Sequence, residues 1–175
     1  FMDRAKLLCS LGQTVLISNF KEYYKLVEYF SQYTKNRMGL AMGVNNLIEI
    51  FDEKYYRHLS GGILEAFGKL FCKDLRVYLY PMQNEDGTIT TSENLKVHPR
   101  MKELYKFFKY NGKVVDITNY NPNILTVFSR TVLRMIAEGE VGWDEMLPQG
   151  LAQLIKKQKL FGYKPKELVE EKKDK

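Results

Sequence analysis

Several residue types are scarce in this 175-residue sequence, and each scarcity excludes a class of protein. The two cysteines, Cys9 and Cys72, lie far apart and form no CxxC motif, which excludes a disulfide framework and a cysteine-rich zinc site. No stretch approaches the ~20 apolar residues that a membrane-spanning helix needs. The first ten residues carry charges and lack the apolar block of a secretory signal. These features favour a cytoplasmic protein that holds no metal and contacts no membrane.

The composition is that of a globular domain. Apolar residues make up 45% of the sequence and charged residues 27%, so a hydrophobic core can form. The length fits a single domain, which we expect over residues 1–163, followed by a charged and disordered tail over 164–175. Because the first residues already read as a helix under way, we expect the chain to be the C-terminal domain of a longer protein.

Short apolar runs of strand length alternate with helical patterns along the chain. The runs are apolar throughout, which is typical of parallel strands covered on both faces. We therefore predict an α/β fold: a Rossmann-like parallel sheet of four or five strands flanked by helices, closed by a C-terminal helical pair. An Asp-Gly pair within 84–91 indicates a tight hairpin. The predicted strands cover residues 14–18, 38–44, 75–81 and 113–118.

Polar residues follow the first two predicted strands. Ser18 and Asn19 end the first strand, and Asn45 and Asn46 follow the second. In open α/β sheets ligands bind beyond the carboxyl ends of the strands, and the N-terminus of the next helix attracts anions. These four residues are therefore predicted to line a phosphate-binding crevice. The alternative is that Asn45 and Asn46 are ordinary helix caps.

The C-terminal region resembles the nicotinate/nicotinamide mononucleotide adenylyltransferases. That family carries an Ile-Ser-Ser-Thr-x-Ile-Arg motif, a helix that ends in a glycine turn, a short Leu-Val-Pro segment and a last helix that ends in Leu-Tyr-Gly. The similarity covers only about 35 residues. The corresponding segments here are Phe-Ser-Arg-Thr-Val-Leu-Arg at 128–134, Glu-Gly at 138–139, Met-Leu-Pro at 146–148 and Leu-Phe-Gly at 160–162.

The resemblance implies a nucleotide-phosphate site on this region. Ser129, Thr131 and Arg134 would face the phosphates, and hydroxyl and N–H groups at a helix start with an arginine one turn on are chemically suited to that role. Arg130 stands where the family has its second serine, and it would either add a phosphate contact or mark a lost one. The implied ligand is ATP or a pyridine mononucleotide, as in a transferase of NAD biosynthesis.

The remainder of the chain departs from that family. The family's Gly-x-Phe-Asn-Pro turn and His-x-Gly-His motif are absent after the first predicted strand, and His58 and His98 have no histidine two or three residues away. The chain is therefore predicted to bind a nucleotide or phosphorylated metabolite without catalysing adenylyl transfer alone. The partners expected from this interpretation are that ligand and the remaining domains of the parent protein.

Two other functions stay open. The chain can be a non-catalytic regulatory or assembly domain, in which the resemblance is a structural remnant. It can also be a nucleic-acid-binding module that uses a basic helix over 99–110, because segment 96–113 holds six Lys or Arg against one Glu, a formal balance of +5. The commoner explanation of such a helix is an amphipathic element with a solvated lysine face, which we favour.

Three further residues have structural interpretations. Trp143, the single tryptophan, is predicted to pack between the last two helices. Cys9 and Cys72 lie among apolar residues and are predicted to be core thiols.

Overall fold

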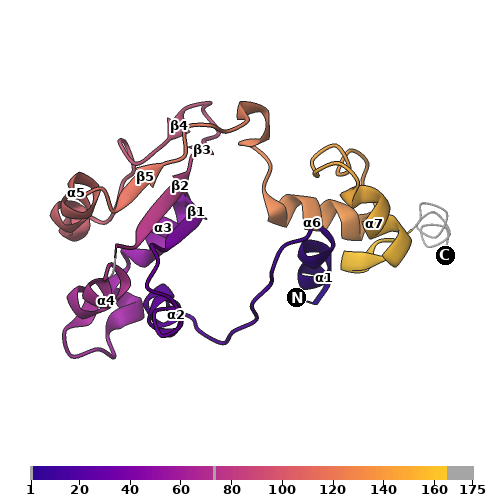
Figure 1. The fold of residues 1–175 in the computed structure, drawn as a ribbon. Coiled ribbons are helices and arrows are strands. Elements are labelled where there is room, and N and C mark those ends of the chain that lie inside the picture. The colour runs from indigo at the N-terminus through magenta and orange to yellow at the C-terminus, as the bar shows by residue number, and fades with distance from the viewer. Residues whose placement is uncertain (1, 73, 165–175) are drawn as a thin grey trace. The chain divides into compact units, whose positions relative to one another are not determined.

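The computed structural model of the chain describes residues 2–72 and 74–164. Two compact units make up the chain (Figure 1). The central unit comprises residues 19–125, and the terminal unit comprises residues 1–18 together with 126–175. The single domain over 1–163 stays a prediction, and all of the predicted tail except Lys164 lies outside the described residues.

The central unit contains a three-stranded parallel sheet, with strands in the order β1-β2-β5. The register aligns Leu40 with Val77, and Val77 with Val114. A separate antiparallel pair, β3 and β4, flanks the turn at Asp86 and Gly87, as the Asp-Gly pair predicts. The strands are β1 (Gly39–Gly43), β2 (Arg76–Tyr80), β3 (Met82–Gln83), β4 (Ile89–Thr90) and β5 (Val114–Asp116).

Four helices of the central unit follow the predicted helical patterns. Their buried side chains pack against those of the sheet and form one hydrophobic core with them. The helices are α2 (Tyr23–Phe30), α3 (Val44–Ile50), α4 (Gly62–Leu70) and α5 (Lys102–Tyr110), with single 3₁₀ turns η1 (Glu53–Tyr56), η2 (Pro99–Met101) and η3 (Pro122–Ile124).

The core lies on one face of the parallel sheet. Burial alternates along β2: Val77 and Leu79 are fully buried, whereas the neighbouring residues Tyr78 and Tyr80 are only half-buried. The strand order β1-β2-β5 runs in one direction across the sheet, and the usual right-handed crossovers between such strands favour connecting helices on a single face. The predicted coverage of both sheet faces by helices is not confirmed for the central unit.

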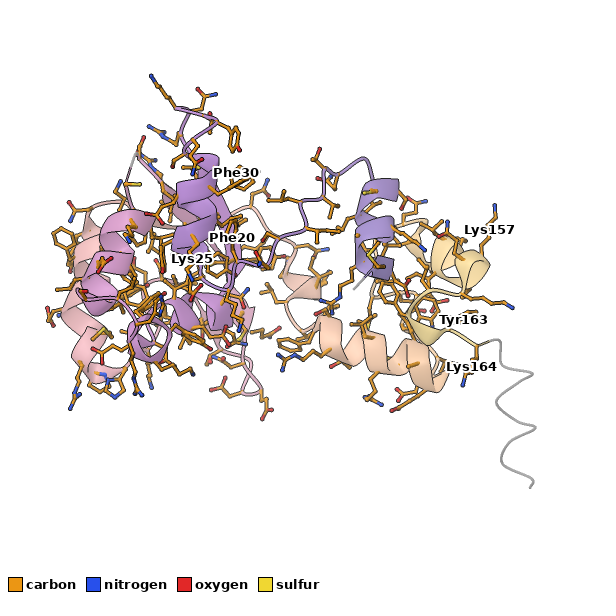
Figure 2. The ribbon with its side chains drawn as sticks, turned by 90° about the horizontal axis from the view of Figure 1, so that it is seen from below. Phe20, Lys25, Phe30, Lys157, Tyr163 and Lys164 are labelled. Atoms are coloured by element: carbon orange, nitrogen blue, oxygen red, sulfur yellow. The ribbon has the colours of Figure 1, made fainter. Side chains whose placement is uncertain are left out.

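The terminal unit is helical and matches the predicted C-terminal pair. Trp143 is buried in its core, as predicted, and its ring meets the Tyr163 ring edge-on at 5.8 Å. The Asp3 carboxylate accepts a hydrogen bond from the Phe161 N–H at 2.8 Å, which joins the two ends of the unit. Figure 2 shows Tyr163 beside the last helix. The elements are α1 (Met2–Ser10), α6 (Ser129–Glu138), α7 (Leu151–Gln158) and η4 (Leu160–Gly162).

Two sequence predictions are corrected. Residues 14–18 form no strand, and Leu16 and Ile17 are 51% and 54% exposed. Apolar and β-branched residues favour a strand, but the strand forms only where a neighbour supplies its hydrogen bonds. Consequently the described residues hold three strands of the predicted parallel sheet, and four or five are not confirmed. Cys9 is exposed on α1 and is not a core thiol. In the described ranges no helix is both long and apolar enough to cross a bilayer.

Candidate functional site

The predicted phosphate cradle lies at the start of α6. Ser129, Arg130 and Thr131 form its first turn, and all three are exposed. The preceding residue, Phe128, supplies no side-chain cap, so the backbone N–H groups of this turn have no side-chain acceptor there. The helix start is thus chemically open to an anion, although a bare helix terminus is common on protein surfaces.

Arg134, the cationic member of the predicted cradle, has other partners. Its guanidinium donates a hydrogen bond to Glu138 at 2.7 Å and also bonds to Glu140. The hydrogen bond to Glu138 is the main cause, and the bond to Glu140 the next, of a pKa of Arg134 above its usual value. A phosphate at this arginine would have to compete with two carboxylates of the same segment.

The predicted strand-end residues lie in two different segments of the chain. Ser18 and Asn19 are exposed in the irregular segment between α1 and α2. Asn45 and Asn46 are exposed in the first turn of α3, whose N-cap is Gly43, so the cap interpretation of the two asparagines is wrong. Ser18 belongs to the terminal unit together with the α6 residues, whereas the other three belong to the central unit. Neither unit by itself holds the complete predicted site.

A groove of about 570 Å³ lies along α5 in the central unit. The segment 92–97 forms one wall, and α5 with its preceding 3₁₀ turn forms the other. We call it the lysine groove, because four lysines line it. The lining residues are Ser92, Glu93, Leu95, Lys96, Val97, Pro99, Lys102, Tyr105, Lys106, Lys109 and Tyr110.

Helical spacing aligns three of the four lysines. Lys102, Lys106 and Lys109 are four and then three residues apart, which places them on one face of α5. Tyr105, between them in sequence, is buried and anchors the helix to the core. The fourth lysine, Lys96, comes from the opposite wall. The groove therefore combines a helical row of cations with a cation from a separate segment.

The lysines differ in how far their charges are compensated. Lys109 forms an ion pair with Glu93 at 2.5 Å, and Lys106 forms one with Glu103 at 2.9 Å. Within the described part of the chain, Lys96 and Lys102 form no ion pair. The groove thus carries an excess of positive charge, which attracts anions.

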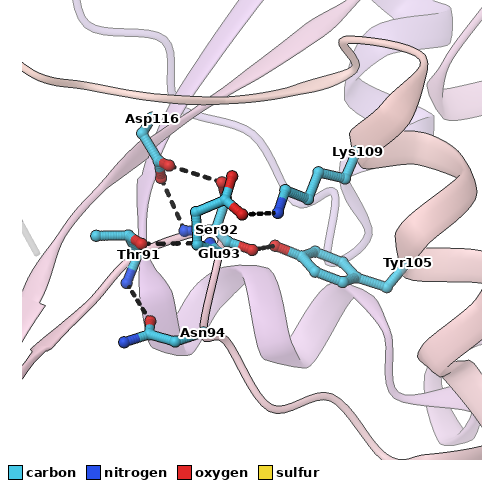
Figure 3. A network of polar contacts seen from close by, with 7 residues as sticks. All are labelled: Thr91, Ser92, Glu93, Asn94, Tyr105, Lys109 and Asp116. Carbon is cyan, nitrogen blue, oxygen red and sulfur yellow. Dashed lines mark hydrogen bonds and ion pairs between the residues drawn. The ribbon is translucent and has the colours of Figure 1, made fainter.

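A hydrogen-bonded network fixes the inner wall of the groove (Figure 3). The Ser92 N–H and hydroxyl donate to the two Asp116 carboxylate oxygens at 2.8 and 2.6 Å. The Tyr105 hydroxyl donates to the Ser92 carbonyl oxygen at 2.7 Å. Burial raises the pKa of Tyr105, so its hydroxyl keeps the proton that it donates. The wall is therefore tied both to the end of β5 and to α5.

Replacing Tyr105 with phenylalanine is expected to lower the free energy of unfolding by about 1 kcal/mol, because the buried Ser92 carbonyl loses its donor. Urea denaturation followed by circular dichroism measures the change. Tyr110→Phe is the matched control, since this ring is 83% exposed and its hydroxyl makes no hydrogen bond within the described residues. Equal losses in the two variants would show that the Ser92 bond contributes nothing.

The sequence predicts the basic helix that lines this groove, but not the groove itself. The basic segment 96–113 is readable from the sequence, which favours a solvated lysine face over a groove. The concavity depends on segment 92–97 lying against α5, and that segment is held by Asp116, which is 24 residues from Ser92. No local pattern connects these residues.

Smaller pockets of about 240 and 230 Å³ also lie in the described residues, next to Trp143 and next to Tyr56. His58 is exposed, and its Nε2 lies 3.2 Å from the Tyr24 hydroxyl, so this histidine has a structural partner. His, Cys, Asp and Glu do not gather in groups of three or more that could hold a metal ion in residues 2–72 and 74–164. Comparisons of the chain with known protein families, with curated proteins and with solved structures find no match.

Proposed function

We propose that this chain is a nucleotide- or phosphometabolite-binding domain whose ligand phosphates lie in the lysine groove. The observation that carries the proposal is the position of two unpaired lysines, Lys96 and Lys102, in a concavity of about 570 Å³. That volume falls within the roughly 300–1,000 Å³ of small-molecule pockets. Lysines from two separate segments that line one groove can bind the same phosphate group.

An aromatic group at the groove favours a nucleotide over inorganic phosphate. Tyr110 lines the groove and is 83% exposed, so its ring is available to stack on a base. Tyr105 also lines the groove, but its ring is committed to the core. In the proposed complex the phosphates contact the lysines and the base contacts Tyr110.

The proposal keeps the finer expectations from the sequence. The resemblance of 128–162 to the adenylyltransferases supports a domain that binds the ligand while another part of a longer cytoplasmic protein supplies the chemistry. A Rossmann-like sheet of four or five strands also remains part of the proposal. Within the described residues β1 and β5 are edge strands, at which further strands can pair.

The test is ATP binding measured by isothermal titration calorimetry at low ionic strength. Lys102→Glu is expected to weaken binding about tenfold or more, because an attractive charge becomes a repulsive one. The substitution places an acid in the first turn of α5, where the helix dipole favours negative charge, so the fold is expected to stay intact.

Two further variants locate the site. Lys35→Glu makes the same charge change at an exposed position outside the groove and is expected to leave ATP affinity nearly unchanged. The double variant S129A/T131A tests the α6 start. Loss of binding in S129A/T131A but not in Lys102→Glu would place the ligand on α6 and overturn the groove proposal. Absence of ATP binding, or tighter and steeply salt-dependent binding of an oligonucleotide, would favour the regulatory or the nucleic-acid function instead.

A further inference from the structure

We infer that Glu93 is a built-in competitor for the ligand: its carboxylate occupies Lys109 in the free protein, and a ligand phosphate takes its place there. This inference rests on the proposed function, because it concerns the same groove. It identifies Lys109 as a phosphate contact and Glu93 as the residue that sets the affinity.

The ion pair itself supports the displacement. The Glu93 carboxylate lies 2.5 Å from the Lys109 ammonium (Figure 3). Both residues line the groove. The Glu93 side chain is 75% exposed, whereas that of Lys109 is 21% exposed. The lysine is therefore held against the wall while the carboxylate reaches it from solvent. An exposed ion pair of this kind is weak and easily exchanged for a phosphate.

The backbone around Glu93 is anchored, so the exchange requires only a side-chain rotation. On one side Ser92 is bonded to Asp116 and Tyr105. On the other side the Leu95 N–H donates to the Thr91 carbonyl at 3.0 Å, and the Leu95 side chain is buried. The wall can keep its shape while the carboxylate leaves Lys109.

A second carboxylate, Glu103, pairs with a lysine of α5 but is not part of the groove lining. Its partner is Lys106, at a spacing of three residues along the helix. Its side chain is 78% exposed, nearly the same as that of Glu93. Glu103 is therefore a matched control: the same residue type, the same exposure and the same kind of partner, outside the cavity.

The experiment is calorimetric titration of ATP into the wild-type chain, Glu93→Gln and Glu103→Gln at one ionic strength. Glu93→Gln is expected to bind ATP about threefold to fivefold more tightly, because the competing ion pair is gone. Glu103→Gln adds the same net charge, and a clearly smaller gain is expected. Because Glu103→Gln also releases Lys106, which lines the groove, equal gains would show that Glu93 is not the particular competitor, and would overturn the inference while leaving the proposed function standing.

A double-mutant cycle distinguishes competition from long-range repulsion. In a Lys109→Gln background the gain from Glu93→Gln is expected to disappear, because there is no longer a shared cation. A gain of full size in that background would contradict the inference. If neither the wild-type chain nor any variant binds ATP, both the proposed function and this inference fail. That outcome differs from equal gains in affinity, which would overturn the inference alone.

Discussion

Replacing Phe67 with alanine is expected to lower the free energy of unfolding of the central unit by about 3–5 kcal/mol, the usual range for a fully buried phenylalanine. The Phe67 side chain is 1% exposed, so the substitution leaves a cavity at the centre of the core. The ring also makes edge-on contacts with several aromatic neighbours, which further stabilise the packing. Those neighbours are Phe51, Tyr56, Phe71 and Phe108, at centroid distances of 4.9, 6.2, 5.7 and 5.2 Å.

Urea denaturation followed by near-ultraviolet circular dichroism measures this effect, because every tyrosine except Tyr163 belongs to the central unit. Fluorescence of the single tryptophan, Trp143, reports the terminal unit, which has a separate core. The control is Leu64→Ala on the same helix, where the side chain is 66% exposed and little loss is expected. Similar losses from Phe67→Ala and Leu64→Ala would contradict the assignment of the core face.

The second large effect is expected from Asp116→Ala, which should lower the free energy of unfolding by about 2–4 kcal/mol. Its carboxylate accepts two hydrogen bonds from Ser92, and bonds to a charged acceptor are worth roughly 1.5–3 kcal/mol each, without full additivity. Ser92 is buried, so its N–H and hydroxyl would lose their acceptors away from water. The groove wall would also loosen, and under the proposed function ATP affinity should fall together with stability.

Asp86→Ala is the matched control for that variant. The Asp86 carboxylate accepts the same pair of bonds from Thr88, from its N–H at 2.9 Å and its hydroxyl at 2.6 Å, but both residues are exposed in the β3–β4 turn. Water can replace these bonds, so a clearly smaller loss is expected. Hydrogen exchange of the Ser92 amide gives an independent measurement. Unchanged protection of that amide in Asp116→Ala would show that Asp116 does not hold the wall.

Sequence patterns correctly located the strands and helices whose formation depends on the spacing of apolar residues within one segment. The apolar runs at 38–44, 75–81 and 113–118 became β1, β2 and β5, because a buried strand requires an apolar run wherever it lies. Segment 14–18 has the same character and forms no strand, which shows where local information ends. Hydrogen-bonded pairing depends on the neighbours that the fold supplies, and these cannot be seen in five residues.

The candidate site shows the same division. Sequence reasoning selected Ser129, Thr131 and Arg134 from a motif, and the motif residues do start a helix. The bonds of Arg134 to Glu138 and Glu140 were missed, although Glu138, four residues on, was a readable signal. The spacing of the lysines of α5 predicts a solvated face, whereas three of them line the groove.

By itself the sequence determined the α/β class, three of the four predicted parallel strands, the hairpin turn, the C-terminal helical pair and the burial of Trp143. Each follows from the spacing of residues within a single element. Only the tertiary structure decided that one sheet face carries the core of the central unit and that segment 92–97 lies against α5 to make a lysine-lined groove. Both depend on contacts between residues distant in sequence, such as Ser92 and Asp116, whose energies arise only when the chain has brought them together.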